Sequence, residues 1–339
     1  MPYRGGIMFM EEKEVKKSIK DTMASVAEKV GKTTTDIVNK TTEGVDKTKD
    51  AVMHAIDQNG DGEIGIDDVI IMGLKVPGIK IDREAFLRKE LFKRFPQEVI
   101  DDAVAYNPLH AKIPQEDIEK IADEVIQYER VCVSGISAAL GTPGGVAMVA
   151  TIPADIAQYY GYMLRATQKL LYLYGFPQID VEEDGQPIDT ETMNTLIVCM
   201  GVMYGVAGAN NALKAMAKAL GTGVEKQLMK KALTKGAIYP IVKSVSKWFG
   251  VKMTKEVFAG FFKKAIPVVG GVIGGGLTYA SFKPCCEKLR KVLKDTMLSN
   301  PNYRVDEKTD DIAEDIEDGV IDVSLEEVIE VEEIEEIEE

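Results

Sequence analysis

The chain has 339 residues, of which 45% are apolar, and its formal net charge is −14. That length and that apolar fraction suffice for a sizeable core, and they exclude a collagen-like or wholly disordered protein. The four cysteines show no CxxC spacing. We therefore expect reduced, buried thiols rather than a disulfide framework, in a cytoplasmic protein without a secretory signal.

The first segment, residues 1–56, contains a repeat of eleven residues between positions 11 and 56. Twelve positions at this spacing hold nine apolar residues and three Thr, while nine Lys and nine acidic residues occupy the other positions. An eleven-residue period keeps a narrow apolar stripe nearly in line along a helix. We expect a long amphipathic helix that lies in a membrane interface, or one that packs on the protein or on another helix.

The segment "DQNGDGEIGIDD", residues 57–68, follows the pattern of an EF-hand calcium loop. Ligand positions 1, 3, 5, 7 and 12 are held by Asp57, Asn59, Asp61, Glu63 (through its carbonyl) and Asp68. Gly62 occupies the sharp turn at position 6, and Ile64 the apolar position 8. The pattern predicts Ca²⁺ binding, and the alternative is an ion-free turn between two helices.

Asp68 departs from the pattern, because calcium sensors usually place Glu at position 12. Asp is one methylene shorter, which predicts weaker Ca²⁺ binding and a smaller margin over Mg²⁺. A second acidic loop, residues 180–191, has a degenerate EF-hand pattern. Pro187 at its position 8 removes the N–H that pairing would use, so we expect an acidic loop there and no second metal site.

Residues 69–300 alternate helical periodicity with helix-breaking residues and show no strand pattern, so we predict an all-α fold. Segment 114–140 begins with Pro and acidic residues and carries an apolar stripe of Ile118, Ile121, Val125, Cys132 and Ile136. Three uncharged runs, 131–154, 192–213 and 265–282, are rich in small residues. We expect them to form buried helices in close, glycine-mediated contact rather than membrane spans.

The charge divides into a basic block and an acidic tail. Residues 214–264 contain twelve Lys against two Glu, and residues 306–339 contain eighteen acidic residues and one Lys. A block of Lys without Arg does not resemble a base-reading surface, so no nucleic-acid partner is expected. The block suits a solvated surface, anionic lipids or the chain's own tail. We expect residues 301–339 to be a disordered acidic tail.

Catalytic motifs are absent from the sequence: no P-loop, no GxSxG and no paired histidines are found. We therefore predict no catalytic residues and lean against an enzyme. Asp155, Tyr159 and Arg165 lie in an apolar region and are weak candidates for a ligand pocket. Asp155 follows Pro153, so a carboxylate in the first turn of a helix also accounts for it.

Segments "GTPGGVAMVATIPADIAQYYGYMLRATQKLLYLYGF", "ALTKGAIYPIVKSVSKWFGVKMTK" and "IPVVGGVIGGGLTYASFKPCCEKLRKVL" together resemble the EcsC family of bacterial proteins. The resemblance covers residues 80–295. It implies an all-helical, cytoplasmic or membrane-associated protein and assigns no catalytic residues. The calcium loop and the acidic tail lie outside it.

The sequence thus predicts four parts: an N-terminal arm and amphipathic helix (1–56), an EF-hand loop (57–68), an EcsC-like helical domain (69–300) and the acidic tail (301–339). The leading hypothesis is a non-enzymatic calcium-binding protein peripheral to the cytoplasmic membrane, with anionic lipids or a membrane protein as partner. The alternatives are a lipid carrier, small-ligand carrier or enzyme that uses a pocket near Asp155 and Arg165, and an interaction scaffold that works through the tail. The sequence carries no signal of oligomeric state.

Overall fold

A computed structural model describes residues 53–140, 152–179, 188–264, 270–304 and 306–320. Within these ranges the regular structure is helical and no strand occurs, which confirms the predicted all-α class. The expected amphipathic helix at 11–56 lies almost wholly outside the described residues, and its last four residues, 53–56, are helical.

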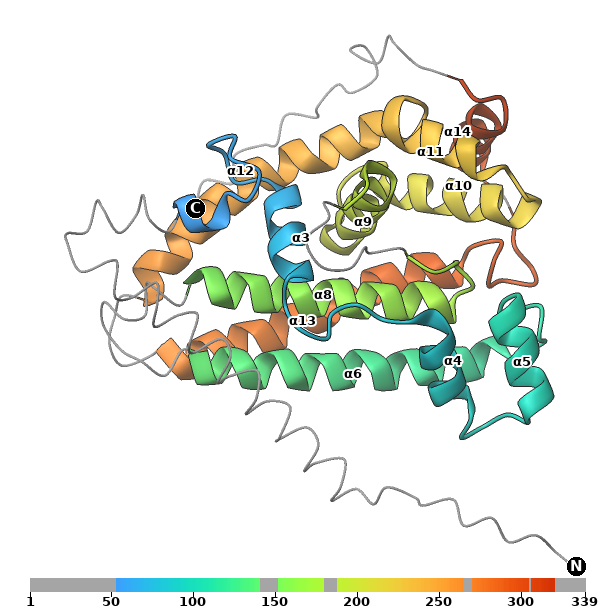
Figure 1. The fold of residues 1–339 in the computed structure, drawn as a ribbon, viewed down its shortest axis with the longest axis horizontal. Helices are drawn as coiled ribbons and strands as arrows, with labels where there is room; N and C mark the ends of the chain where they lie inside the picture. Colours follow the sequence, from blue (N-terminus) through green and yellow to red (C-terminus); the bar gives the residue numbers. More distant parts are fainter. Residues whose placement is uncertain (1–52, 141–151, 180–187, 265–269, 305, 321–339) are drawn as a thin grey trace, which may run out of the picture. The chain divides into compact units, whose positions relative to one another are not determined.

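The helices follow one another through the chain as Figure 1 shows. Their bounds are α3 Ile66–Leu74, α4 Arg83–Leu91, α5 Gln97–Ala105, α6 Gln115–Leu140, α8 Ile152–Leu173, α9 Thr190–Tyr204, α10 Ala209–Thr222, α11 Lys226–Lys235, α12 Tyr239–Lys264, α13 Gly270–Lys294 and α14 Glu307–Glu317. The expected start of a helix at Pro114 and its acidic first turn are confirmed by α6, as is the apolar stripe, whose five members are all buried.

The chain divides into two compact units. Unit 1 comprises residues 1–81, 123–166 and 250–286, and unit 2 comprises residues 82–122, 167–249 and 287–339. Unit 1 therefore joins the 57–68 loop to parts of α6, α8 and α13. Unit 2 contains α4, α5, α9, α10, α11 and α14 together with the remaining parts of the long helices.

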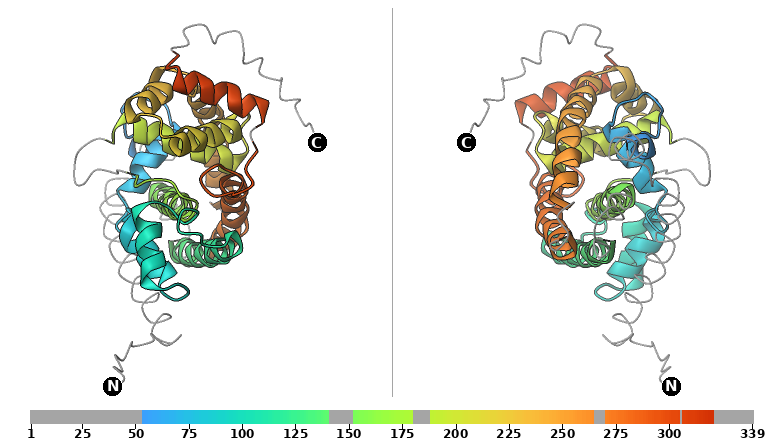
Figure 2. Two further views of the ribbon diagram at one scale, coloured as in Figure 1. Left: turned by 90° about the vertical axis from the view of Figure 1, so that its right-hand side faces the viewer. Right: turned by 90° about the vertical axis from the view of Figure 1, so that its left-hand side faces the viewer.

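In unit 1, α6, α8 and α13 lie side by side (Figures 1 and 2). The Arg130 guanidinium of α6 donates to the Tyr279 carbonyl of α13 at 2.7 Å and stacks 3.3 Å from the Tyr279 ring centroid. Tyr159 of α8 contacts Phe282 of α13 edge to face, with ring centroids 6.3 Å apart. Polar and aromatic contacts thus join the three helices in pairs.

Glycines allow α3 and α8 to touch backbone to backbone, also within unit 1. A Cβ atom on Gly73 would lie 2.8 Å from the Gly161 nitrogen, and one on Gly161 would lie 3.0 Å from the Gly73 carbonyl oxygen. Any side chain at either position would therefore force the helices apart. This contact fixes the helix that leaves the 57–68 loop against the core of unit 1.

In unit 2, α9 is the central helix. Of its residues, 194–203 are all buried, as expected for the uncharged run 192–213. Asp189 caps its first turn by accepting from the N–H groups of Glu191 and Thr192, and Gly205 ends it at φ 79°. Helices α10 and α11 pack against α9, and α14 packs against α10 and α11.

A single arginine closes the end of α5 in the same unit. The Arg83 guanidinium donates to the carbonyls of Val104 at 2.7 Å, Tyr106 at 2.9 Å and Phe176 at 3.1 Å. The last carbonyls of a helix have no intrahelical donor, so this cation satisfies groups that water would otherwise hydrate. Burial lowers the pKa of Arg83 from its ordinary value, and Tyr172 acts in the opposite direction.

The prediction of a disordered tail over residues 301–339 is wrong for its first part. Residues 307–317 form α14, with Asp306 accepting from the Thr309 N–H at its start. Thr309, Ala313 and Ile316 share one buried face of this helix. The acidic residues lie around that face, so a high charge density does not prevent docking. Residues 321–339 lie outside the described part.

No helix in the described ranges is long and apolar enough to cross a membrane. The "GGVIGGG" stretch, residues 270–276, belongs to the first turns of α13. The lead-in "GTPGG", residues 141–145, lies outside the described residues.

Candidate functional site

The 57–68 loop closes by hydrogen bonds between its own side chains and its backbone. Asp57 accepts from the Gly60 N–H at 2.6 Å through Oδ1 and from the Gly62 N–H at 3.0 Å through Oδ2. Asn59 Oδ1 accepts from the Asp61 N–H at 2.9 Å. Each Asp or Asn therefore folds the chain two to five residues ahead of it, as these side chains do in turns.

Two glycines supply the backbone conformations that this path needs. Gly60 and Gly62 have φ values of 76° and 84°, in the left-handed region that other residues rarely adopt. Asp61 lies between them, and its Oδ1 accepts from the Glu63 N–H at 2.8 Å. The expected sharp turn at Gly62 is therefore present, and a second turn at Gly60 precedes it.

Asp68 joins the beginning of the loop to its end. Its Oδ1 accepts from the N–H groups of Gln58 at 2.7 Å and Asn59 at 3.2 Å, and its Oδ2 accepts from the Gly65 N–H at 2.7 Å. The side chain is fully buried. Burial raises the pKa of the Asp68 carboxyl, although the three N–H groups act in the opposite direction.

Apolar side chains anchor the loop at both ends. Ile56 before the loop, Ile64 at its position 8 and Ile66 and Val69 after it are all buried. The acidic and amide side chains between them lie toward solvent, because Asn59, Asp61 and Glu63 are exposed and Asp57 is half-buried. This alternation places the oxygens of Asp57, Asn59 and Asp61 outside the core, whereas the Asp68 carboxylate is buried with the hydrophobic residues that hold the loop's ends together.

The donor set of the loop consists of oxygen alone. Hard oxygen ligands suit Ca²⁺ and Mg²⁺, and no thiolate or imidazole belongs to the five predicted positions. Within the described ranges, no three His, Cys, Asp or Glu side chains gather in an arrangement that could hold a metal ion. The carboxylates instead point at backbone N–H groups. Each carboxylate has about four lone-pair sites, so such bonds leave capacity for a cation.

The second acidic loop, 180–191, is described only at its end. Asp189 lies at the N-terminus of α9, where its carboxylate accepts three hydrogen bonds, from the N–H groups of Glu191 and Thr192 and from the Thr192 hydroxyl. The pKa of Asp189 is lowered, because these hydrogen bonds and the charge of Lys230 outweigh the effect of burial. Its carboxylate therefore acts as a helix cap. Positions 180–187 lie outside the described residues.

Asp155, Tyr159 and Arg165 all lie on α8 and contact three different partners. Asp155 Oδ1 accepts from the Ser137 hydroxyl at 2.9 Å, and the Tyr159 hydroxyl lies 3.2 Å from that of Ser281. Asp155 and Arg165 are ten residues apart on one helix, which is about 15 Å along its axis. The three side chains are thus spread along the helix rather than gathered at one point.

Arg165 belongs to a buried ion pair that the sequence did not reveal. Its Nε lies 3.0 Å from Glu129 Oε1, with the Glu129 side chain fully buried, and its guanidinium also donates to the Gly78 carbonyl. Burial disfavours the charge of Arg165, but Glu129 outweighs this and the pKa of Arg165 is raised. Partial burial raises the pKa of Tyr128, the neighbour of Glu129 in the chain, to about 12, and Cys132 and Glu129 act in the same direction.

The acidic helix α14 lies against lysines of the basic block. Lys214 of α10 pairs with Asp295 at 3.0 Å and Asp306 at 3.8 Å, and Lys218 pairs with Asp310. This contact lies within unit 2, and both views in Figure 2 show α14 beside α10. The expectation that the tail occupies part of the basic block is therefore met at α10.

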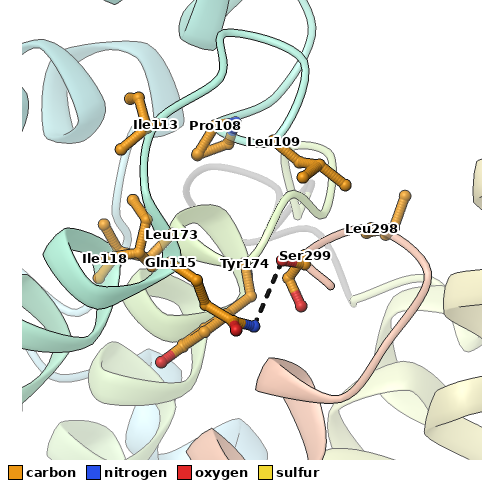
Figure 3. Close-up of a pocket in the computed structure, with 9 residues that line it drawn as sticks. All are labelled: Pro108, Leu109, Ile113, Gln115, Ile118, Leu173, Tyr174, Leu298 and Ser299. Carbon is orange, nitrogen blue, oxygen red and sulfur yellow. Dashed lines mark hydrogen bonds between the residues drawn. The ribbon is translucent and has the colours of Figure 1, made fainter. Parts of the chain in front are cut away.

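A small cavity in unit 2 lies between apolar side chains of the turn at 108–113 and those of α6 and α8 (Figure 3). Its volume is about 10 Å³, which is room for one water molecule and too little for a substrate. The Gln115 amide at its edge donates to the Lys294 carbonyl at 2.8 Å and the Ser299 carbonyl at 3.4 Å. The cavity therefore belongs to the packing of the unit.

Comparison of the chain with protein-family models, with curated proteins and with solved structures finds no match in any of the three. The resemblance to the EcsC family over residues 80–295 stays a prediction from its motifs. Among the predicted site residues, those of the 57–68 loop are joined by hydrogen bonds within one short segment.

Proposed function

We propose that the chain is a calcium-binding protein that acts at a membrane surface or on a membrane partner. The observation that carries the proposal is the conformation of the 57–68 loop. Its left-handed glycine at position 6, Gly62, and the contacts by which Asp68 closes the loop support the proposal, because calcium loops of this type have a sharp glycine turn at that position.

Five residues would hold the ion when it is bound. The side chains of Asp57, Asn59, Asp61 and Asp68 and the Glu63 carbonyl would supply oxygen ligands. Three of these side chains are carboxylates, so the site offers charge compensation to a divalent cation. Ligation requires the exposed carboxylates to turn from backbone N–H groups toward the ion, which surface side chains do readily.

Asp68 sets both the affinity and its pH dependence. Its short side chain is tied to both ends of the loop, so binding by both oxygens would disturb contacts that close the loop. We expect modest affinity with Mg²⁺ as a competitor. Because the pKa of Asp68 is raised, protons should compete with the cation at a higher pH than they would at an ordinary carboxylate.

The membrane part of the proposal comes from the sequence on either side of the loop. The amphipathic repeat at 11–56 runs directly into Asp57, and the basic block supplies lysines that anionic headgroups would attract. Ion binding would fix the angle between the segment before the loop and α3, which couples the ion to the placement of that segment.

Calorimetric titration of the metal-free full chain with Ca²⁺, and then with Mg²⁺, tests the ion site. Asp61→Asn should weaken Ca²⁺ binding at least tenfold, and Asp68→Glu should strengthen it several-fold. Asp102→Asn on α5 makes the same charge change on an exposed carboxylate and should leave binding unchanged. Equal binding by the wild-type chain and Asp61→Asn would contradict the proposal.

Co-sedimentation with phosphatidylserine-containing vesicles, in Ca²⁺ or in chelator, tests the membrane part separately. We expect more pelleting with Ca²⁺, and a loss of that difference in Asp61→Asn but not in Asp102→Asn. Intact Ca²⁺ binding with negligible pelleting in both conditions would keep the ion site and remove the membrane role.

A further inference from the structure

Five lysines of α11 and α12 are exposed without an ion pair to any other described residue: Lys226, Lys230, Lys235, Lys243 and Lys247. Lys226 and Lys230 share one face of α11, and Lys243 and Lys247 share one face of α12, because each pair is four residues apart. The nearby lysines of α10 differ, because Lys214 and Lys218 form ion pairs with acidic residues in or near α14. A concentration of positive charge therefore remains beside the docked helix.

The chain leaves α14 next to these lysines. Lys231 of α11 donates its ammonium hydrogen to the Gly319 carbonyl at 2.5 Å. The Val320 carbonyl lies against Gly236, where an added Cβ would approach it to 2.8 Å. Gly236 stands between the end of α11 and the start of α12. The segment that follows Val320 thus begins at the junction of the two lysine-bearing helices.

The segment that follows Val320, residues 321–339, is acidic and thus opposite in charge to the lysines of α11 and α12. It contains ten acidic residues, no basic residue and eight large aliphatic residues. Nineteen residues span up to about 60 Å when extended, and α11 is only about 15 Å long. The segment is therefore long enough to pass over α11 and the first turns of α12.

We propose that residues 321–339 dock on the lysine surface of α11 and α12 in the same molecule. The docked segment would continue the contact that α14 makes with α10 and would cover the five exposed lysines. A tethered segment acts at an effective concentration on the order of millimolar, so weak contacts between carboxylates and ammonium groups suffice. The contact would loosen in salt, because the Debye length falls from about 10 Å at 0.1 M to about 3 Å at 1 M.

Zero-length carbodiimide cross-linking of the dilute full chain, followed by peptide mass spectrometry, tests the docking directly. This reagent joins a lysine to a carboxylate in contact with it. We expect isopeptide bonds between the 321–339 segment and lysines of α11 and α12 at 20 mM salt, with at least a fivefold lower yield at 500 mM. Links from the segment to lysines spread evenly over the chain would overturn the proposal.

A binding assay in trans tests whether the site is already occupied. The probe is a fluorescent synthetic peptide of residues 321–339, followed by anisotropy at 20 mM salt. We expect binding to a chain that ends at Val320, and at least tenfold weaker binding to the full chain, whose own segment competes. Equal binding to both chains would overturn the proposal.

Two matched variants of the shortened chain test the specificity of the surface. K226Q/K230Q/K243Q/K247Q should weaken peptide binding at least tenfold. The control K89Q/K93Q/K112Q/K291Q removes the same charge from exposed lysines elsewhere in unit 2 and should change binding less than twofold. Circular dichroism confirms that both variants fold. Equal weakening in the two variants would indicate unspecific charge attraction and refute the docking site.

Phosphatidylserine vesicles distinguish the tail from a lipid as the occupant. If the tail covers the lysines, vesicle binding that depends on the four α11 and α12 lysines should be at least fivefold stronger for the shortened chain than for the full chain. Binding that depends on these lysines and is equal for the two chains would assign the surface to lipid and overturn docking of the tail.

Discussion

Two acidic regions of this protein use the same side chains in different ways. The 57–68 loop has five acidic residues among twelve, and the segment 306–318 has eight among thirteen. In the loop, the carboxylates accept from N–H groups of their own segment. In the α14 region, they pair with lysines of another helix, through Asp306 and Asp310.

The difference comes from the residues between the acidic ones. Glycines at positions 60 and 62 turn the backbone so that its N–H groups face the nearby carboxylates. The α14 segment has no glycine before Gly319, and its buried residues Thr309, Ala313 and Ile316 follow helical spacing. Except at its start, where Asp306 also accepts from the Thr309 N–H, its N–H groups are used inside the helix, so the other carboxylates need partners elsewhere. Charge density alone therefore predicts neither structure nor disorder.

The first test of this difference removes the Asp68 carboxylate. We expect it to destabilise the 57–68 loop and to give the largest of the three effects. Asp68→Ala leaves three N–H groups without their acceptor and should destabilise the loop by about 5 kcal/mol, since hydrogen bonds to charged groups are worth about 1.5–3 kcal/mol each. Hydrogen exchange of the amides in 57–74 measures it. Asp61→Ala, at an exposed position, should cost less than about 1 kcal/mol; equal losses in the two variants would show that Asp68 does not close the loop.

The second test shortens the side chain of Ile316. We expect it to destabilise the docking of α14, by somewhat less than the loss of Asp68 destabilises the loop. Ile316 is fully buried, and an Ile→Ala change in a core costs about 3 kcal/mol. Limited proteolysis should cut Ile316→Ala within 306–320 much faster than the wild-type chain. The half-buried Ile312 provides the control, because Ile312→Ala should raise cleavage only slightly. Unchanged cleavage in Ile316→Ala would mean that ion pairs, not apolar burial, hold the helix.

The two regions should also respond to pH with opposite signs, which is the smallest of the three effects. The pKa of Asp68 is raised by burial, so its contribution favours the closed loop below the ordinary carboxyl range and is lost as pH rises through the raised value. The pKa of Asp306 is lowered, since hydrogen bonds from Thr309 and the charge of Lys214 outweigh burial. Its contribution is present above the ordinary range and is lost as pH falls through the lowered value.

Hydrogen exchange in chelator, corrected for the intrinsic pH dependence of exchange, measures both signs in one sample. From pH 7 to pH 4, loop amides should gain protection, and amides of α14 should begin to lose it toward the acid end. Each change should be below about 1 kcal/mol. Parallel changes in the two regions would indicate a global response and remove the distinction between them.

The sharp turn at Gly62 could be predicted from the sequence because its geometry is local. Asp57, Gly62 and Asp68 are within twelve residues, and their contacts depend on chain spacing alone. Tertiary contacts were harder to predict. Glu129 falls on the apolar stripe of α6 between Val125 and Cys132, a position that signals a buried carboxylate. Its partner Arg165 lies on another helix, and no local pattern could pair the two.

The α14 helix was missed for a related reason. Its apolar positions follow helical spacing, but the surface they cover belongs to α10 and α11, about 80 to 100 residues earlier in the chain. An isolated helix of eleven residues is marginal in water. The stability of α14 thus depends on the surface of α10 and α11, which cannot be predicted from the sequence of α14 itself.

The contact between Gly73 and Gly161 fixes one end of the 57–68 loop. At the C-terminal end of the loop, α3 contacts α8 through backbone atoms, with no side chains between Gly73 and Gly161. This end of the loop is therefore held in place. A change in the shape of the loop therefore cannot be absorbed by a movement of α3 toward α8.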